Sequence, residues 1–328
     1  MKKYDVLALG ELLIDFTSNG ESEDGAPLFK ANPGGAPCNV LALLSRLGKT
    51  TAFLGKVGDD MFGHMLSGIV KSVGIDISGL SFTKKVPTTL AFVKTYEDGD
   101  RDFSFYRNPG ADVMLTVEDL NREMLANTKI FHFGSLSMTH ENAREATKEA
   151  VRIAKEAGAL LSFDPNLRES LWDCLENAKE QIKYGLSVCD ILKISDNEIE
   201  FITGTTDFDE GVRLLKSQYP QIKILNVTAG AQGSYCYYED KKVFVPASRL
   251  GKTIDTTGAG DTFCGCVLYY VLEHGMDCYG EEHMKEMLTF ANAAAYLVTT
   301  RKGTICVMPD RKEIEDIIKL YSGKYDKL

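Results

Sequence analysis

The stretch "DTTGAGDTFCGC", residues 255–266, places an acidic side chain directly after a turn of small residues and before a long apolar run. Gly258, Ala259 and Gly260 leave backbone N–H groups accessible, and the apolar run predicts a buried helix. The N-terminus of a helix attracts anions such as phosphate. We interpret Asp261 as a general base and the three small residues as the turn that stabilises a transferring phosphoryl group. The alternative is that Asp261 only caps the helix.

Apolar runs of strand length recur along the rest of the chain, at residues 5–10, 51–58, 129–136, 159–165, 190–195 and 222–228. Helical patterns lie between some of them, at 39–48 and 141–158, and both end in glycine. Strands that alternate with helices predict an α/β fold with a mainly parallel sheet covered on both faces. Ligands bind where the strands of such sheets end.

One segment departs from this alternation. Residues 89–96 and 101–107 flank Asp98-Gly99, a strong hairpin turn signal, so we expect two antiparallel strands outside the main sheet. The hairpin is either a plain surface feature or a lid or dimer contact, because an isolated hairpin needs something to pack on.

The composition limits the partners of this protein. The chain has 328 residues, of which 44% are hydrophobic and 26% charged, and its formal net charge is −10. This balance argues against nucleic acid or an anionic membrane as a partner, and no apolar stretch is long enough to span a bilayer. The eight cysteines include no C-x-x-C pair, so we expect reduced thiols in a cytoplasmic protein rather than a zinc or redox motif.

The common nucleotide-binding motifs are absent. "GKT" occurs at 48–50 and 251–253, but Leu43 and Pro246 stand where a Walker A loop requires glycine. No G-x-G-x-x-G fingerprint follows the first strand, which gives little support to a nicotinamide dehydrogenase.

Two other glycine-rich segments follow or precede regular structure. "TAGAQGS" (228–234) can bring backbone amides to a phosphate, although strand-to-turn glycines are common. "NPGGAPCNV" (32–40) can let backbone contact a ligand at Gly34 and Gly35, with Asn39 facing the same crevice, or it is a plain helix start.

Together these segments resemble the ribokinase-like (pfkB) carbohydrate kinases. "GGAPCNVLALLSRLG" is similar to the N-terminal signature of that family and "DTTGAGDTFCGCVLYY" to its C-terminal signature. The resemblance continues through "SFDPNLRESLWD", "ISDNEIEFITG", "NVTAGAQGS" and "ANAAAYLVTTRKG", so it covers nearly the whole chain. Within the family, "GELLIDF", "FYRNPGAD" and "DPNLR" resemble fructokinases most, followed by 2-keto-3-deoxygluconate kinases.

The resemblance implies a fold and an assembly. We expect residues 1–328 to form a single domain, a three-layer α/β/α sandwich with a mainly parallel sheet. Residues 11–32 and 88–110 would form a small β-lid that excludes water from the site, since an open site would hydrolyse ATP. The lid would also join two copies of the chain in a homodimer.

The resemblance also implies catalytic and sugar-binding roles at matching positions. Asp261 would be the base, residues 258–260 the anion hole, and Arg168 the contact to the transferring phosphate. The sugar hydroxyls would be held by Asp15, Gly34, Gly35 and Asn39, and Arg107 would close over the sugar from the hairpin.

The implied cofactors are ATP, Mg²⁺ and, as a further ion, K⁺. Asn197 and Glu200 would place Mg²⁺ through water, and Asp255 and Thr257 would cradle K⁺. The ATP phosphates would lie along Thr228, Gly230 and Gly233, and adenine near Asn292.

The sequence therefore predicts an ATP-dependent sugar kinase that converts D-fructose to fructose 6-phosphate. A 2-keto-3-deoxygluconate kinase or another sugar kinase of the same family is the alternative, but Asp15 would oppose the carboxylate of a sugar acid. A regulator that binds sugar or nucleotide without catalysis is a second alternative. Asp261 directly after its small-residue turn disfavours that reading.

Overall fold

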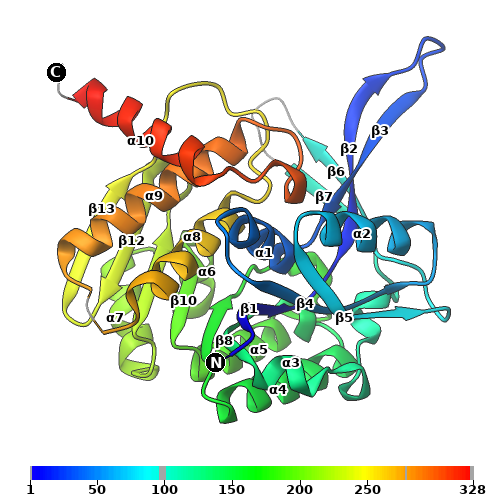
Figure 1. Cartoon of the computed structure of the whole chain (residues 1–328), viewed down its shortest axis with the longest axis horizontal. Coiled ribbons are helices and arrows are strands. Elements are labelled where there is room, and N and C mark those ends of the chain that lie inside the picture. The colour runs from blue at the N-terminus through cyan, green and yellow to red at the C-terminus, as the bar shows by residue number, and fades with distance from the viewer. Residues whose placement is uncertain (1, 96–100, 278, 326–328) are drawn as a thin grey trace.

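A nine-stranded sheet forms the centre of the computed structural model, which describes residues 2–95, 101–277 and 279–325 (Figure 1). The strand order is β13-β12-β11-β10-β9-β8-β1-β4-β5. All neighbours are parallel except that β12 runs antiparallel to both β11 and β13. The predicted α/β fold with a mainly parallel sheet is confirmed. The strands are β1 (Tyr4–Leu9), β4 (Thr51–Gly58), β5 (Ile75–Thr83), β8 (Thr128–Gly134), β9 (Leu160–Asp164), β10 (Ile191–Ser195), β11 (Ile224–Thr228), β12 (Gly233–Tyr238) and β13 (Lys241–Pro246).

Helices cover both faces of this sheet and complete three layers. One face carries α1 (Ala36–Arg46), α2 (Met61–Ser72), α8 (Ala259–His274) and α9 (Glu281–Thr299), with α10 (Arg311–Tyr325) packed on α9. The other face carries α3 (Arg122–Ala126), α4 (Glu141–Glu156), α5 (Leu175–Val188), α6 (Asp196–Thr203) and α7 (Phe208–Gln218).

The burial of β1, an interior strand of the sheet, explains why its sequence is mainly apolar. Val6 and Ala8 point into the core under α1 and α8, whereas Leu7 and Leu9 point into the core on the opposite face. All four side chains are fully buried. Alternate residues of a strand face opposite sides, so a sheet covered on both faces needs an unbroken apolar run. Each buried valine or leucine contributes about 1.5–3 kcal/mol.

A second sheet of four strands rises from the body of the molecule (Figure 1). It has the order β3-β2-β6-β7 and consists of β2 (Leu13–Glu21), β3 (Pro27–Gly34), β6 (Leu90–Thr95) and β7 (Arg101–Tyr106). The two predicted hairpin arms are confirmed as β6 and β7, which pair antiparallel. The Asp98-Gly99 turn lies outside the described residues. β2 begins buried and ends exposed, so this small sheet, called the lid below, projects into solvent.

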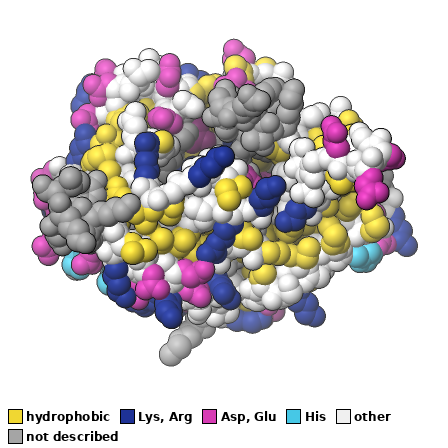
Figure 2. All heavy atoms as spheres, turned by 90° about the horizontal axis from the view of Figure 1, so that it is seen from above, with side chains coloured by type: hydrophobic (Ala, Val, Ile, Leu, Met, Phe, Trp, Pro, Cys, Tyr) yellow, Lys and Arg dark blue, Asp and Glu magenta, His cyan; other side chains and the backbone are white. Residues whose placement is uncertain are grey.

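The surface seen from above carries positively and negatively charged side chains interspersed with apolar ones (Figure 2). The described cysteines are free thiols, and Cys174 and Cys306 are exposed while the other five are buried. Within the described ranges, no helix has both the length and the apolarity needed to cross a membrane.

Candidate active site

A pocket of about 540 Å³ opens at the carboxyl ends of the strands, between the main sheet, the lid and the N-terminal ends of α1 and α8. Its position agrees with the rule that ligands of parallel sheets bind beyond the strand ends. The structure brings many of the predicted residues into its lining: Asp15, Gly35, Asn39, Arg168, Asn197, Thr257, Gly258, Gly260 and Asp261.

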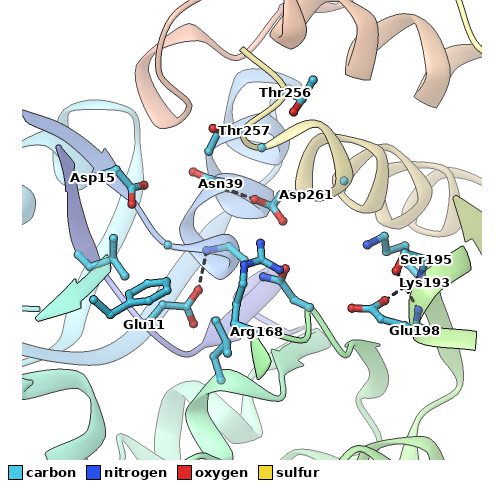
Figure 3. Close-up of a pocket in the computed structure, with 18 of the residues that line it drawn as sticks. Glu11, Asp15, Asn39, Arg168, Lys193, Ser195, Glu198, Thr256, Thr257 and Asp261 are labelled. Carbon is cyan, nitrogen blue, oxygen red and sulfur yellow. Dashed lines mark hydrogen bonds between the residues drawn. The ribbon is translucent and has the colours of Figure 1, made fainter. Parts of the chain in front are cut away.

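Asp261 lies in the first turn of α8 and points into this pocket (Figure 3). Gly258 is the N-cap of the helix and has a φ of 78°, a left-handed conformation that favours glycine. Gly258 provides no side-chain cap, and Asp261 lies three positions beyond it rather than at the N-cap. Its Oδ2 instead accepts a 2.7 Å hydrogen bond from Nδ2 of Asn39 on α1.

The surroundings of Asp261 adjust its basicity in two directions. Burial raises its pKa, whereas the hydrogen bond from Asn39 and the charges of Lys193 and Arg168 lower it. The Asp261 carboxylate is therefore a stronger base than an ordinary aspartate, and the bond from Asn39 holds its orientation. Proton abstraction from a hydroxyl needs both properties.

Two further carboxyl groups lie at the end of the pocket nearest the lid, those of Glu11 and Asp15. Glu11 Oε1 accepts a 2.8 Å hydrogen bond from the backbone N–H of Ala36 and so fixes the start of α1. Burial raises the pKa of each carboxyl group to about 7, and the nearby Glu11 charge adds to the shift at Asp15. Glu11 was not among the predicted site residues, although a polar residue just after the first strand is a signal for this edge of the sheet.

Gly34 lies behind Asp15 rather than in the lining. It ends β3 opposite Leu13, and a Cβ atom at Gly34 would collide with the Asp15 carboxylate. The absence of a side chain at this position therefore makes room for Asp15 to face the pocket. Ala259 also lies outside the lining, although both of its neighbours, Gly258 and Gly260, contribute to it.

The loop after β9 carries Asn166 and Arg168 into the pocket. Asn166 has a φ of 45°, uncommon for a residue other than glycine. The Arg168 charge lowers the pKa of both Asp15 and Asp261, which line the same pocket.

The structure corrects the expectation for Glu200. Glu200 is exposed on α6 and outside the pocket lining, whereas Glu198 lines the pocket and is buried. Glu198 Oε2 accepts from the backbone N–H of Ser195, and Oε1 accepts from that of Leu167. The two residues are two positions apart on a helix, so they face different directions, and only Glu198 turns toward the strand ends.

The structure also places Arg107 differently from the expectation. Its guanidinium contacts the Asp112 carboxylate at 2.5 Å, and both side chains are at most 5% exposed. It also donates to Oγ1 of Thr139 and to the carbonyl of Leu136, which lines the pocket. Arg107 therefore lies behind the pocket wall, because a buried carboxylate and a carbonyl take up its donors, and it does not cover the cavity.

The residues predicted to bind ATP lie beside the pocket rather than in it, except for Asn197. Thr228 ends β11 next to Ser195 of β10, a lining residue, so the segment with Gly230 and Gly233 continues the same sheet edge. Asn292 is buried, and its amide bonds to Oγ of Ser234 and to the carbonyls of residues 245 and 246.

Asp255 and Thr257, the residues predicted to hold K⁺, lie next to each other at the edge of the pocket. Asp255 Oδ1 accepts from the backbone N–H and the hydroxyl of Thr257, and Thr257 lines the pocket while Asp255 does not. Across the described ranges, no three His, Cys, Asp or Glu side chains come together as metal ligands.

Comparison with known proteins agrees with this geometry. Residues 3–311 match the model of a family described as pfkB family carbohydrate kinase. Fructokinase-2 of Solanum lycopersicum is 44% identical over 317 residues, which cover 96% of each chain.

Two solved structures are similar over almost their whole length. A fructokinase from Xylella fastidiosa with bound ATP has a TM-score of 0.88 and 33% identity, covering 97% of this chain and 99% of its own. A fructokinase from Vibrio cholerae O395 with fructose, ADP and a calcium ion has a TM-score of 0.85 and 30% identity, covering 95% of this chain and 98% of its own.

Proposed function

Because this chain belongs to the pfkB family of carbohydrate kinases, we propose that it transfers the γ-phosphoryl group of ATP to D-fructose and produces fructose 6-phosphate. The observation that carries the proposal is the position of Asp261 in the pocket, on the first turn of α8 and beside Gly258 and Gly260, which also line the pocket. The fructokinase relatives support fructose as the acceptor.

Phosphoryl transfer requires a base on one side of the reacting hydroxyl and positive partners for the phosphate. Asp261 accepts the hydroxyl proton while the sugar oxygen attacks the γ-phosphorus. The N–H groups of residues 258–260 and the positive end of α8 stabilise the charge on the transferring oxygens. Arg168, which lines the same pocket, supplies a cation for the same group.

The sugar end of the pocket favours a neutral substrate over a sugar acid. Glu11 and Asp15 both face this end, and carboxylates bind hydroxyl groups well but repel another carboxylate. Asn39 and the backbone at Gly35 add further polar contacts, while Leu13 and Phe105 provide apolar surface. We therefore place 2-keto-3-deoxygluconate behind fructose as a substrate.

ATP would extend from the pocket along the edge of the sheet. Asn197 lies in the lining, and the turn with Thr228, Gly230 and Gly233 lies one strand further on. Asn292 would act near adenine by holding β12 and β13 against α9, since its amide is bonded within the protein.

The donor set fits Mg²⁺ carried with the nucleotide. Mg²⁺ keeps several waters and is bound by one or two carboxylates plus substrate phosphates. Glu198 lines the pocket and retains lone pairs beyond its two backbone bonds, so we assign to it, through water, the role first given to Glu200. When bound, Mg²⁺ neutralises phosphate charge.

A potassium ion near the anion hole remains part of the proposal. Asp255 and Thr257 form a closed turn immediately before Gly258. Carboxylate and carbonyl oxygens suit K⁺, and an ion here would order the turn that receives the phosphate.

The lid supports two further parts of the proposal, water exclusion and a homodimer. β3 exposes Leu28 and Phe29, and β7 exposes Tyr106, each by more than 40% of its surface. Phe16 and Phe92 stack on the same sheet and Phe29 packs edge-on against Phe92. Such an apolar surface on a projecting sheet is suited to a second copy of the chain.

The test is a phosphorylation screen with ATP and Mg²⁺ over ketoses, aldoses and sugar acids. We expect D-fructose to have the highest kcat/KM, with fructose 6-phosphate as the product and little ATP hydrolysis without sugar. A sugar acid that is phosphorylated at least ten times more efficiently would contradict the substrate but not the kinase. Failure to phosphorylate any sugar would favour a non-catalytic regulator.

A further inference from the structure

Lys193 is a buried cation in the pocket that the mechanism above does not use. It is the third residue of β10, with Leu192 and Ile194 on either side, and its side chain is 9% exposed. Nζ lies 3.2 Å from both carboxylate oxygens of Asp164, the last residue of β9. Within the described ranges, this carboxylate is the one hydrogen-bonding partner of the ammonium group, which has three N–H donors.

The ammonium group lies next to the anion-binding turn. A Cβ atom added to Gly260 would stand 3.3 Å from Nζ of Lys193, so the lysine occupies the space in front of that turn. In Figure 3, Lys193 and Glu198 lie on one side of Asp261, and Glu11 and Asp15 lie on the other. Lys193 is therefore on the side of the base away from the sugar, where the phosphoryl donor must lie for in-line attack.

A purely structural role does not account well for the buried ion pair of Lys193 and Asp164. Burying an ion pair seldom stabilises a fold more than apolar residues of similar volume would, because both charges must leave water. The described lining contains two cations, Arg168 and Lys193, and four carboxylates, those of Glu11, Asp15, Glu198 and Asp261. In the described lining, Arg168 and Lys193 are thus the cationic side chains that can pair with a phosphate.

We propose that Lys193 is a catalytic residue that contacts the transferring phosphoryl group as a second fixed cation, a proposal that rests on the function proposed above. The primary hydroxyl oxygen of the sugar forms a bond to the γ-phosphorus, and the bond from that phosphorus to the β,γ-bridging oxygen breaks. The hydroxyl proton passes to Asp261, and ADP leaves. Lys193 stays protonated and donates to a non-bridging oxygen throughout, so it lowers the energy of the transition state without exchanging a proton.

Asp164 acts in this scheme as a positioning residue. Its Oδ1 accepts from Nζ of Lys193 and also, at 3.1 Å, from the backbone N–H of Asn166. The next backbone N–H, that of Leu167, is held by Glu198. Asp164 thus orients Lys193 directly and helps to hold the strained loop that presents Arg168, so that both cations depend on it.

The charges around Lys193 keep it in the required state. Burial works to lower its pKa, but Asp164, Glu198, Asp261 and the thiol of Cys264 outweigh burial and hold the pKa above its usual value. The Lys193 charge also affects His132 on β8. Burial and then this charge lower the pKa of His132 to about 3, so the imidazole stays neutral. Lys193 is therefore protonated throughout the working pH range.

The experiment compares Lys193→Met, Lys193→Arg and the double variant Asp164→Asn/Lys193→Met with the wild-type enzyme. We expect kcat for fructose to fall by about 10²–10³-fold in Lys193→Met, the range for loss of one electrostatic contact to the transition state. Arginine should recover part of this loss. The dissociation constants of fructose and ADP, measured by calorimetry, should change less than threefold, whereas ATP should bind more weakly.

The double variant separates catalysis from structure. It removes both buried charges, while asparagine at position 164 keeps an Oδ1 acceptor for the backbone N–H of Asn166. If Lys193 is only structural, kcat should recover in this variant. If Lys193 contacts the phosphate, kcat should stay low. The acid limb of the kcat profile should also move to higher pH in Lys193→Met, because Lys193 lowers the pKa of Asp261, while Asn39 and Arg168 still act on it.

Lys56→Met is the matched control, since Lys56 is a strand lysine paired with Asp119 at 2.5 Å outside the pocket. We expect its kcat to remain within twofold of wild type. Wild-type turnover in Lys193→Met, or recovery in the double variant, overturns the inference and leaves the proposed function intact. A folded wild-type protein that phosphorylates no sugar overturns both.

Discussion

Nδ2 of Asn39 donates a 2.7 Å hydrogen bond to Oδ2 of Asp261 across 222 positions of the chain. The bond joins the first turns of α1 and α8, the two helices whose N-terminal ends face the pocket. One carboxylate oxygen is thereby held in place, and the other remains available to a hydroxyl in the pocket. Asn39 thus fixes the direction in which Asp261 acts.

Replacement of Asp261 by Asn tests the general base. The amide keeps the size of the side chain but cannot take a proton, so we expect kcat to fall by about 10²–10⁴-fold. Fructose affinity measured by calorimetry should stay within a few-fold of wild type. Near-normal turnover of Asp261→Asn would remove the base from the mechanism.

Glu198 and Glu200 form a matched pair of substitutions on one helix. Glu198→Gln weakens the acceptor for the N–H groups of Leu167 and Ser195 and removes a charge from the pocket. We expect kcat to fall at least tenfold and the Mg²⁺ concentration for half-maximal activity to rise. Glu200→Gln, on the exposed face, should remain within twofold of wild type. A larger loss of kcat in Glu200→Gln than in Glu198→Gln would indicate that Glu200 places Mg²⁺.

Arg107 should matter for stability more than for direct sugar contact. Arg107→Ala leaves the Asp112 carboxylate buried without its partner, and breaking a buried pair costs about 3–5 kcal/mol. Urea unfolding should reveal this loss. As a control, Arg152→Ala removes an exposed pair with Glu149 and should change the stability much less, because water and salt screen exposed pairs. If Arg107→Ala keeps the wild-type stability and only the KM for fructose rises, Arg107 would instead be a residue that closes over the sugar.

The contribution of Glu11 and Asp15 to the stability of the ligand-free protein should fall as the pH rises from about 4 to 7. Burial raises the pKa of both Glu11 and Asp15 to about 7, so in this window the folded state holds protons that the unfolded chain releases. Asp15→Asn removes one such group. Between pH 5 and 7.5 the free energy of unfolding should decrease less in this variant than in the wild type. The difference should be about 2 kcal/mol, because one pKa unit corresponds to 1.36 kcal/mol. Identical slopes in urea titrations would show that Asp15 is not held protonated.

The turn of Asp255 and Thr257 predicts a response to K⁺. Turnover should increase when K⁺ replaces tetramethylammonium at constant ionic strength, because a bound ion would order the anion-binding turn. Asp255→Asn should reduce this increase, since it weakens the acceptor of both Thr257 bonds. Equal rates in the two salts would exclude an activating ion at this position.

Local sequence patterns determined much of the fold. The apolar runs at 51–58 and 190–195 predict strands that the structure contains as β4 and β10, since side-chain periodicity and burial are set within a few residues. The small-residue turn before Asp261 likewise predicts the start of α8, because backbone conformation at glycine is a local property.

Tertiary structure alone decided which side chains meet. Which of Glu198 and Glu200 faces the pocket depends on the rotation of α6 against the sheet, and Arg107 turns inward because Asp112 is buried beside it. The pairing of Lys193 with Asp164 follows from the adjacency of β9 and β10, which no local pattern encodes. Contacts between residues far apart in the chain are selected by the packing of whole elements, so the composition of the site appears only once the sheet is assembled.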